Sequence, residues 1–205
     1  MDDIVAMKRS MRRETVGRIL AMAPERRFSE EAELVSKFPT LPGWTGANRV
    51  LLYAKAFPEE ISTEPLLRLT LEAGKRLVCP RVDRRAKGLQ LFEIQDLDAD
   101  FEEGTLAIPE PKRTCPEVAP SEVDWVLVPG LAFDERGYRL GRGAGHYDRL
   151  LPRLRAEVPC WALILDAQWV EKVPVEPHDL PLDGVASTSR ISWPSLQRKA
   201  VPRSL

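Results

Sequence analysis

Apolar and polar residues recur with a helical period at the start of the chain. From Asp2 to Met22 the apolar positions fall on one side of a helix with charged residues between them, and the pattern stops before Pro24. This predicts an amphipathic helix, and a similar, shorter pattern predicts a second helix over 28–38. The stretch 39–47, with two prolines and two glycines, is typical of a loop.

Short apolar runs replace the helical period further along the chain. Arg49–Ala54 (RVLLYA) and Leu77–Pro80 have the length and character expected of strands. Between them, Ser62 or Thr63 can cap a helix that ends near Gly74. The order strand, helix, strand suggests a βαβ unit and hence a parallel sheet.

The longest apolar run, 123–133 (VDWVLVPGLAF), predicts a central strand that is covered on both faces. Before it, the proline-rich passage 109–120 looks like an excursion across the surface. A helix is expected over 146–155, which Pro152 ends or kinks. Further strands are expected at 89–94, 160–166 and 183–187.

The composition fits one folded unit. With 205 residues, of which 43% are hydrophobic, the chain can bury about two-thirds of its unfolded surface, which is enough for one core. We therefore expect a single α/β domain over 1–196, followed by a frayed tail over 197–205.

Charge and cysteine content narrow the class of protein. The chain has 30 basic and 31 acidic residues, so no chain-wide field attracts nucleic acid or a membrane. No run approaches the ~20 apolar residues of a membrane span. Cys79, Cys115 and Cys160 fit neither a disulfide framework nor a zinc motif. These features predict a cytoplasmic protein with a local small-molecule site and no nucleic-acid or membrane partner. They do not report the oligomeric state, for which a monomer is favoured.

The candidate chemistry lies in the segment 137–151, GYRLGRGAGHYDRLL, between the central strand and the expected helix. Gly141, Gly143 and Gly145 stand at alternate positions, and glycine permits the backbone conformations in which successive amides converge on phosphate oxygens. The helix that follows can add its free N–H groups. This pattern suits a polyphosphate ligand.

Arginine is concentrated around the same glycines. Residues 136–155 contain six arginines and one acid, Asp148, which gives a formal charge of plus five within a chain of net charge -1. The planar guanidinium group matches phosphate bidentately. The spacing is neither the Walker nor the Rossmann pattern, and from these residues alone a solvated surface turn stays an alternative.

The segment RLGRGAGHYDR closely resembles the RxGxGKGYYDR signature of the 5-formyltetrahydrofolate cyclo-ligase family. Four further elements match the family in the same order along the chain. They are KRSMR at 8–12, FPEEISTE at 57–64, GTLAIPEP at 104–111 and VPVEPHDLPLDGV at 173–185. Neither histidine of the chain, His146 or His178, has a recognisable nucleophile motif, so a hydrolytic triad is unsupported.

The resemblance implies a three-layer α/β sandwich with a mainly parallel sheet, similar to the NagB/RpiA/CoA-transferase group. It also implies an enzyme of one-carbon metabolism, an ATP- and Mg²⁺-dependent cyclo-ligase. Such an enzyme converts 5-formyltetrahydrofolate to 5,10-methenyltetrahydrofolate and releases ADP and phosphate. ATP would then be the co-substrate and Mg²⁺ the cofactor.

The family pattern implies roles for residues of this sequence. Arg142 and Tyr147 correspond to catalytic positions, and Glu60 corresponds to a carboxylate that accepts hydrogen bonds from the pterin ring. The implied ATP contacts are Lys8, Arg12, Arg139, Gly141, Arg142, Gly143, Ala144, Gly145, His146 and Tyr147. The implied substrate contacts are Arg12, Lys55, Glu60, Arg142, Gly143, Ala144, Gly145 and His146.

Asp148 and Asp179 correspond to Mg²⁺ ligands, and Mg²⁺ commonly takes one or two carboxylates together with phosphates and waters. Without the resemblance, Asp148 can simply stabilise a helix start. Lys8 and Arg12, four residues apart on one helix face, can likewise form a plain solvated surface. Trp125 is expected to pack in the core.

Three residues depart from the family pattern. Ala144 stands where the signature usually has lysine, His146 stands where it has the first of two tyrosines, and Leu106 occupies a place often held by tryptophan. The lysine would be a direct countercharge to phosphate, and its loss weakens the site unless Arg142 or another cation compensates. This leaves open an alternative function, a catalytically weak or inactive folate- or nucleotide-binding member of the family.

Overall fold

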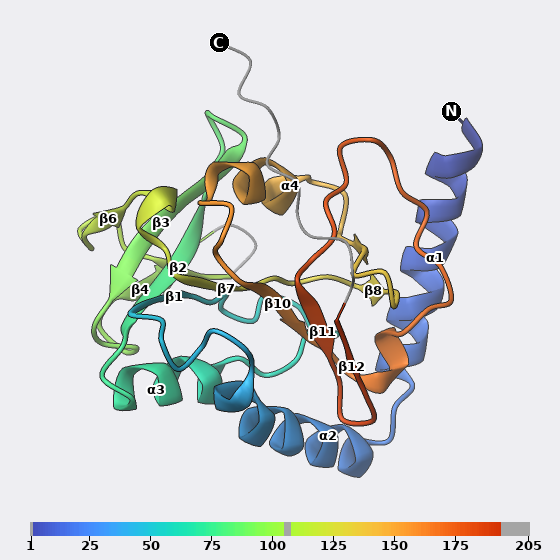
Figure 1. Ribbon diagram of the computed structural model, residues 1–205, viewed down its shortest axis with the longest axis horizontal. Coiled ribbons are helices and arrows are strands. Elements are labelled where there is room, and N and C mark those ends of the chain that lie inside the picture. The colour runs from blue at the N-terminus through green and yellow to red at the C-terminus, as the bar shows by residue number, and fades with distance from the viewer. Residues whose placement is uncertain (1, 105–107, 194–205) are drawn as a thin grey trace.

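The computed structural model describes residues 2–104 and 108–193, and within these residues one eight-stranded sheet forms the centre of the molecule (Figure 1). From one edge to the other, the strands are β12 (Ile191–Ser192), β11 (Gly184–Ala186), β10 (Cys160–Leu163), β7 (Trp125–Leu127), β1 (Arg49–Leu51), β2 (Arg76–Asp83), β3 (Gly88–Ile94) and β6 (Glu117–Val118). The neighbours from β11 to β2 are all parallel, and the outer pairs are antiparallel. The sheet is therefore mainly parallel, as the order of predicted elements suggests.

The central strand β1 marks a switch in the strand order. It lies between β2, which follows it in the sequence, and β7, which comes much later. The chain therefore leaves β1 and β7 toward opposite sides at their carboxyl ends, where open parallel sheets bind ligands. The segments that follow these two strands, 52–63 and 128–147, contain most of the candidate site residues.

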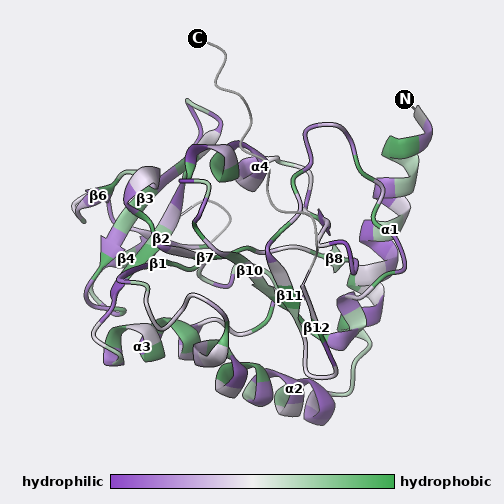
Figure 2. Ribbon diagram, viewed as in Figure 1, coloured by the Kyte–Doolittle hydropathy of each residue, from purple (hydrophilic) through white to green (hydrophobic). Residues whose placement is uncertain are grey.

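Helices on both faces of the sheet make three layers (Figure 1). α2 (Pro24–Lys37) and α3 (Glu64–Glu72) cover one face, α4 (His146–Leu150) lies on the other, and α1 (Asp2–Leu20) lies at the side of the molecule. An apolar cluster under α2 and α3 includes Trp125, which is fully buried as expected. A second cluster lies under α4. Figure 2 shows hydrophobic residues concentrated on β7, β10 and β11.

Two short hairpins lie beside the main sheet. β4 (Phe101–Glu103) pairs with β5 (Pro109–Pro111), and β8 (Ala132–Phe133) pairs with β9 (Arg139–Leu140). Turns of 3₁₀ helix occupy Phe38–Thr40, Pro120–Glu122, Leu151–Arg153 and Asp166–Gln168. The β8–β9 hairpin stands directly before the glycine-rich segment and determines where that segment leaves the core.

Several helix boundaries differ from the predicted ones, each for a local reason. α2 begins at Pro24 rather than at residue 28, because proline fits the first helical turn. Pro152 limits α4 to five residues followed by a 3₁₀ turn, so the predicted helix over 146–155 is wrong in length. Thr63 is the N-cap residue of α3, but its hydroxyl accepts a hydrogen bond from the backbone N–H of Lys55 at 2.8 Å instead of capping the helix.

The long apolar run 123–133 does not form one strand. β7 ends at Leu127, since Pro129 cannot donate to a strand ladder and the chain then turns into β8. β1 likewise ends before the predicted Ala54. The proline-rich passage contains β5 and β6, and β12 has no counterpart among the predicted strands.

Cys79, Cys115 and Cys160 are buried, as expected, and are free thiols. No helix among the described residues has the length and apolar character needed to cross a membrane. The expected tail, 197–205, lies outside the described residues.

Candidate active site

The glycine-rich loop, residues 141–145, follows the β8–β9 hairpin. The hairpin turn is fixed by the fully buried carboxylate of Asp134, which accepts hydrogen bonds from the backbone N–H groups of Arg136 and Val173 at 3.0 and 2.9 Å. Within the loop, Gly143 and Gly145 have φ values of 103° and 66°, which are favourable only for glycine. The anchored hairpin and these two glycines together define the path of the loop.

The helix α1 connects the loop to the C-terminal part of the chain. Nε of Arg12 donates to the carbonyl oxygen of Gly141 at 2.8 Å, and Nζ of Lys8 donates to the carboxylates of Glu176 and Asp179, both at 2.8 Å. Burial opposes the charge of Lys8, but the two carboxylates outweigh it and raise its pKa above the usual value. Lys8 in turn lowers the pKa of Asp179 against the effect of burial. One face of α1 therefore contacts two distant segments, so it is not a plain solvated surface.

The carboxylate of Asp148 is held by Arg139. Both Nη atoms of Arg139 donate to Oδ1 of Asp148, at 2.8 and 2.7 Å, and Arg139 is only 7% exposed. Arg139 therefore fixes the carboxylate at the start of α4. A direct contact between Arg139 and phosphate stays a prediction.

Arg142 extends from the loop to the segment that follows β1. It pairs with the buried carboxylate of Glu59, and its guanidinium carbon lies 3.4 Å from the centroid of the Phe57 ring. Burial lowers the pKa of Arg142, although a guanidinium group stays charged at neutral pH. The cation predicted to be catalytic is thus already engaged with an acid and an aromatic ring.

Glu60 shapes the same segment. Its Oε2 accepts hydrogen bonds from the backbone N–H groups of Ala56 and Phe57 at 2.8 and 3.2 Å. Burial raises the pKa of Glu60, while these hydrogen bonds and the charge of Lys55 act in the opposite direction. Oε1 of Glu60 has no hydrogen bond within the described part of the chain, so this oxygen is available to an N–H group of a ligand.

The charge of Glu60 acts on the hydroxyl groups of two tyrosines, Tyr53 and Tyr147. Burial raises the pKa of both hydroxyls, and the negative charge of Glu60 raises both further. The hydroxyl oxygen of Tyr147 is buried and has no hydrogen-bond partner among the described residues. It is one of five such side-chain atoms in the described part of the chain, and a ligand contact for it stays a prediction.

His146 and Arg149 contact each other at the end of the loop. Nη2 of Arg149 donates to the carbonyl oxygen of Ala144 at 2.7 Å and lies 3.3 Å from Nδ1 of His146. Burial and the charge of Arg149 lower the pKa of His146, which favours the neutral ring. A neutral imidazole can accept a hydrogen bond at Nδ1, so His146 and Ala144 hold the same guanidinium group.

The carboxylates of Asp148 and Asp179 fit Mg²⁺ by their chemistry. Their side chains are 27% and 12% exposed, and each keeps one oxygen that accepts no hydrogen bond from the described residues. Within those residues, no group of three or more His, Cys, Asp or Glu side chains is arranged to hold a metal. A bound Mg²⁺ would therefore complete its shell with phosphate oxygens and waters, as is usual for this ion.

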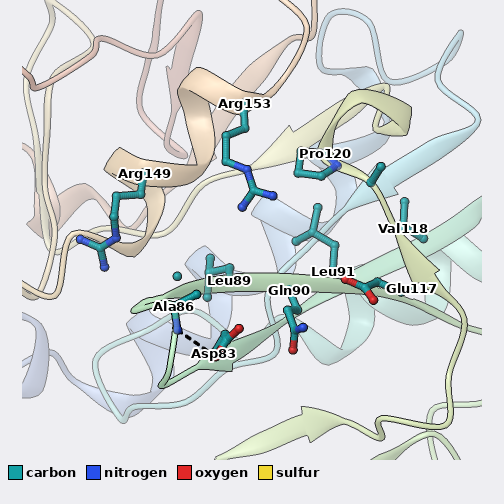
Figure 3. A pocket seen from close by; sticks show the side chains of 12 residues that line it. Asp83, Ala86, Leu89, Gln90, Leu91, Glu117, Val118, Pro120, Arg149 and Arg153 are labelled. Carbon is teal, nitrogen blue, oxygen red and sulfur yellow. Dashed lines mark hydrogen bonds between the residues drawn. The ribbon is translucent and has the colours of Figure 1, made fainter.

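A cavity of about 500 Å³ lies between α4 and the β2–β3 hairpin (Figure 3). Leu89 and Leu91 form part of its lining, and Arg149 and Arg153 reach it from the α4 side. None of the predicted ATP or substrate contacts lines this cavity. The contacts of the loop, rather than the cavity, therefore define the site.

The sequence did not point to several residues that complete the site. Glu59 and Phe57 contact Arg142, Glu176 contacts Lys8, and Arg149 contacts the loop. The adjacent glutamates 59 and 60 are visible in the sequence, but residue types alone do not decide which of the two pairs with an arginine. The predicted neighbour of the pterin, Leu106, lies outside the described residues.

The fold and the site together define a class, an α/β protein whose polar side chains gather where a mainly parallel sheet changes strand order. Within that class, the chain belongs to the 5-formyltetrahydrofolate cyclo-ligase family, whose sequence profile matches residues 4–188. The match spans every predicted site residue, from Lys8 to Asp179.

Individual relatives agree with this membership. The chain is 33% identical to a 5-formyltetrahydrofolate cyclo-ligase of Escherichia coli over 173 residues, which cover 83% of this chain and 94% of that protein. It is 32% identical to the protein of the same name from Mycolicibacterium smegmatis, over 83% of this chain and 91% of that protein. Its structure is similar to the 5,10-methenyltetrahydrofolate synthetase of Aquifex aeolicus, with a TM-score of 0.81, 27% identity and coverage of 97% and 98% of the two chains.

Proposed function

We propose that this protein uses ATP and Mg²⁺ to cyclise 5-formyltetrahydrofolate to 5,10-methenyltetrahydrofolate in the cytoplasm, releasing ADP and phosphate. The observation that carries this proposal is that α1 and the segment after β1 both contact residues 141–147, while the C-terminal segment is joined to α1. α1 reaches the loop through Arg12, the segment after β1 reaches it through Glu59, and the C-terminal segment is joined to α1 through Lys8. Cations suited to phosphate thus lie beside acceptors and aromatic rings suited to a heterocycle.

The proposed chemistry activates the formyl oxygen, which is otherwise a poor leaving group. The γ-phosphoryl group of ATP forms a bond to this oxygen while its bond to ADP breaks. N10 then attacks the formyl carbon and loses its proton, and phosphate leaves with the oxygen. A transfer of this kind depends on positioning and charge neutralisation rather than on a protein nucleophile.

Residues of this chain supply positioning and charge in the proposed reaction. Arg12 and the loop amides bind the triphosphate, Oε1 of Glu60 accepts from the pterin, and the hydroxyl of Tyr147 bonds the substrate. Arg142, between the loop and the segment after β1, orients the reacting oxygen. Mg²⁺ held by Asp148 and Asp179 would neutralise phosphate charge. The loop amides are those of Gly141, Gly143, Ala144 and Gly145, and the other predicted contacts are Lys8, Lys55, Arg139 and His146.

The direct test mixes the protein with Mg-ATP and 5-formyltetrahydrofolate and follows the near-ultraviolet absorbance of the methenyl product together with ADP. Both products should appear only when all components are present. If neither methenyl absorbance nor folate-dependent ADP is formed, the proposed reaction is wrong.

Glu60→Gln tests the proposed pterin contact. Glutamine can still accept the backbone hydrogen bonds that Glu60 accepts, but it lacks the charge that favours pterin N–H donors, so KM for the folate should rise about ten-fold or more while the fold is kept. Glu64→Gln, at an exposed glutamate in the first turn of α3, is the matched control. An equal effect of the two substitutions would contradict the assignment of Glu60.

Ala144 favours one alternative, a family member that binds folate or nucleotide with little turnover. This alternative predicts ligand binding in calorimetry without product. Introducing lysine by Ala144→Lys should then raise activity.

A further inference from the structure

Arg149 lies in α4 and contacts the glycine-rich loop. Within the described part of the chain it has no acidic partner. Four of the six arginines between residues 136 and 155 form ion pairs with carboxylates, and these pairs are Arg136–Asp134, Arg139–Asp148, Arg142–Glu59 and Arg155–Asp124. Arg153 points into the cavity toward Leu91, and the guanidinium of Arg149 lies apart from it at the cavity edge (Figure 3).

The guanidinium of Arg149 lies directly against the loop. Its Nη2 donates to the carbonyl oxygen of Ala144 at 2.7 Å, and a Cβ atom at Gly145 would lie 2.8 Å from its Nη1. Gly145 therefore gives the guanidinium room to approach, in addition to its left-handed φ. His146 holds the same Nη2 atom from the other side at 3.3 Å.

Two other cations near the loop differ from Arg149. Arg142 is turned toward the buried Glu59 and the ring of Phe57, so its charge is already matched. Arg12 lies at the opposite end of the loop, where a Cβ at Gly143 would be 3.5 Å from its Nη2. Arg12 and Arg149 therefore approach the loop at Gly143 and at Gly145, two residues apart.

We propose that Arg149, which matches the last arginine of the signature, binds a phosphoryl group of the nucleotide beside Ala144, with His146 as the residue that positions its guanidinium. This role rests on the proposed function, because ATP is the ligand assigned to the loop. A guanidinium group has five N–H donors, so Arg149 can keep its contact with Ala144 and still donate to phosphate oxygens.

Arg149→Gln removes the charge at an exposed position. Binding of the nonhydrolysable analogue AMP-PNP with Mg²⁺, measured by calorimetry, should weaken about 10- to 100-fold, and KM for ATP should rise in parallel while kcat changes less. Arg153→Gln makes the same change of charge on the same segment and should alter affinity by less than about two-fold. Unchanged affinity in Arg149→Gln, or an equal loss in both variants, would overturn the role of Arg149.

A rescue experiment separates phosphate binding from a merely structural clamp on the loop. Ala144→Lys returns a cation to the loop and should restore most of the lost affinity in the Arg149→Gln background, with little gain in the wild-type background. Lysine at 144 cannot replace the hydrogen bond to the carbonyl oxygen of Ala144. Failure of the rescue in a variant whose thermal unfolding matches the wild type would show that Arg149 only clamps the loop.

These measurements also separate the failure of Arg149 from the failure of the proposed reaction. Wild-type protein that binds AMP-PNP but forms no methenyl product would refute the reaction and leave Arg149 to be decided by binding. Product formation with an unchanged KM for ATP in Arg149→Gln would refute Arg149 alone. Wild-type protein that binds no nucleotide would refute both.

Discussion

The hydroxyl group of Tyr147 is one of five buried side-chain N or O atoms that have no hydrogen-bond partner in the described part of the chain. Such a group costs about 1–3 kcal/mol relative to a paired one. The phenol ring itself packs against the apolar cluster under α4. The residue therefore contributes to stability through its ring, and a ligand role for its hydroxyl stays a prediction.

Tyr147→Phe should separate stability from function. Removal of the unpaired hydroxyl should leave the free energy of unfolding unchanged or raise it by about 1 kcal/mol, while product formation decreases. Chemical denaturation and steady-state kinetics measure the two effects. Tyr138→Phe, at a partly exposed ring beside Arg136, serves as the control. Lower stability together with unchanged activity would show that the hydroxyl has a structural partner instead.

Residue types alone predicted some features of the candidate site but not others. The spacing of Lys8 and Arg12 correctly placed them on one face of a helix, and the glycine pattern located the loop. The choice between Glu59 and Glu60 depends on how the segment after β1 turns, which is set by backbone hydrogen bonds to Glu60 and not by a periodic pattern.

On the paired strands β10 and β11, a tryptophan ring lies directly against a glycine. A Cβ atom at Gly184 of β11 would lie 2.2 Å from the ring of Trp161, which is almost fully buried in β10. The ring cannot move away without displacing its neighbours, because protein interiors are close-packed. Gly17 of α1 is different, since nothing outside its own helix lies within 4 Å of a Cβ built there.

Gly184→Ala should destabilise the protein by about 1–3 kcal/mol through overpacking, whereas Gly17→Ala should stabilise it by about 0.5–1 kcal/mol through helix propensity. Denaturant titration of both variants measures the difference. If the two substitutions change the free energy of unfolding equally, the Trp161 ring has more room beside Gly184 than the structure implies.

At the level of elements, patterns that mix apolar and polar positions predicted element bounds better than a uniformly apolar run. The first helix and the strand at 89–94, which both contain polar residues between the apolar ones, closely match α1 and β3. The run 123–133 was read as one strand because apolar character says nothing about where pairing stops, and Pro129 ended it. β12 was missed because a strand of two residues has no period to detect.

For the molecule as a whole, Asp124 joins the centre of the sheet to the segment that follows α4. Its carboxylate accepts hydrogen bonds from the backbone N–H groups of Arg49 and Asn48, at 2.8 and 3.2 Å, and from Nη2 of Arg155 at 3.0 Å. Burial opposes its ionisation, but these donors outweigh burial and lower the pKa of Asp124. Because the folded-state pKa is depressed, the stabilisation is present above the unfolded pKa and is lost as pH falls through the folded pKa.

Asp124→Asn should therefore lower the free energy of unfolding at neutral pH by about 1–2 kcal/mol. The difference from the wild type should shrink as pH falls below about 4, where the carboxylate of the unfolded chain takes up a proton, and should be lost below the depressed folded-state pKa. Urea denaturation at a series of pH values measures this. A difference that stays constant with pH would show that the charge of Asp124 has no role.

The contacts of α1 with the loop and with the C-terminal segment have a consequence for exchange of amide hydrogens with solvent. Lys8 and Arg12 tie the middle of this helix to the rest of the molecule, while residues such as Met7 are exposed. Local opening of the helix therefore breaks the contacts that a bound nucleotide would reinforce. Exchange in residues 5–14 should slow when Mg-ATP is added, while exchange in α3, on a different part of the sheet, should stay the same. Deuterium uptake followed by mass spectrometry would thus report nucleotide binding without any turnover.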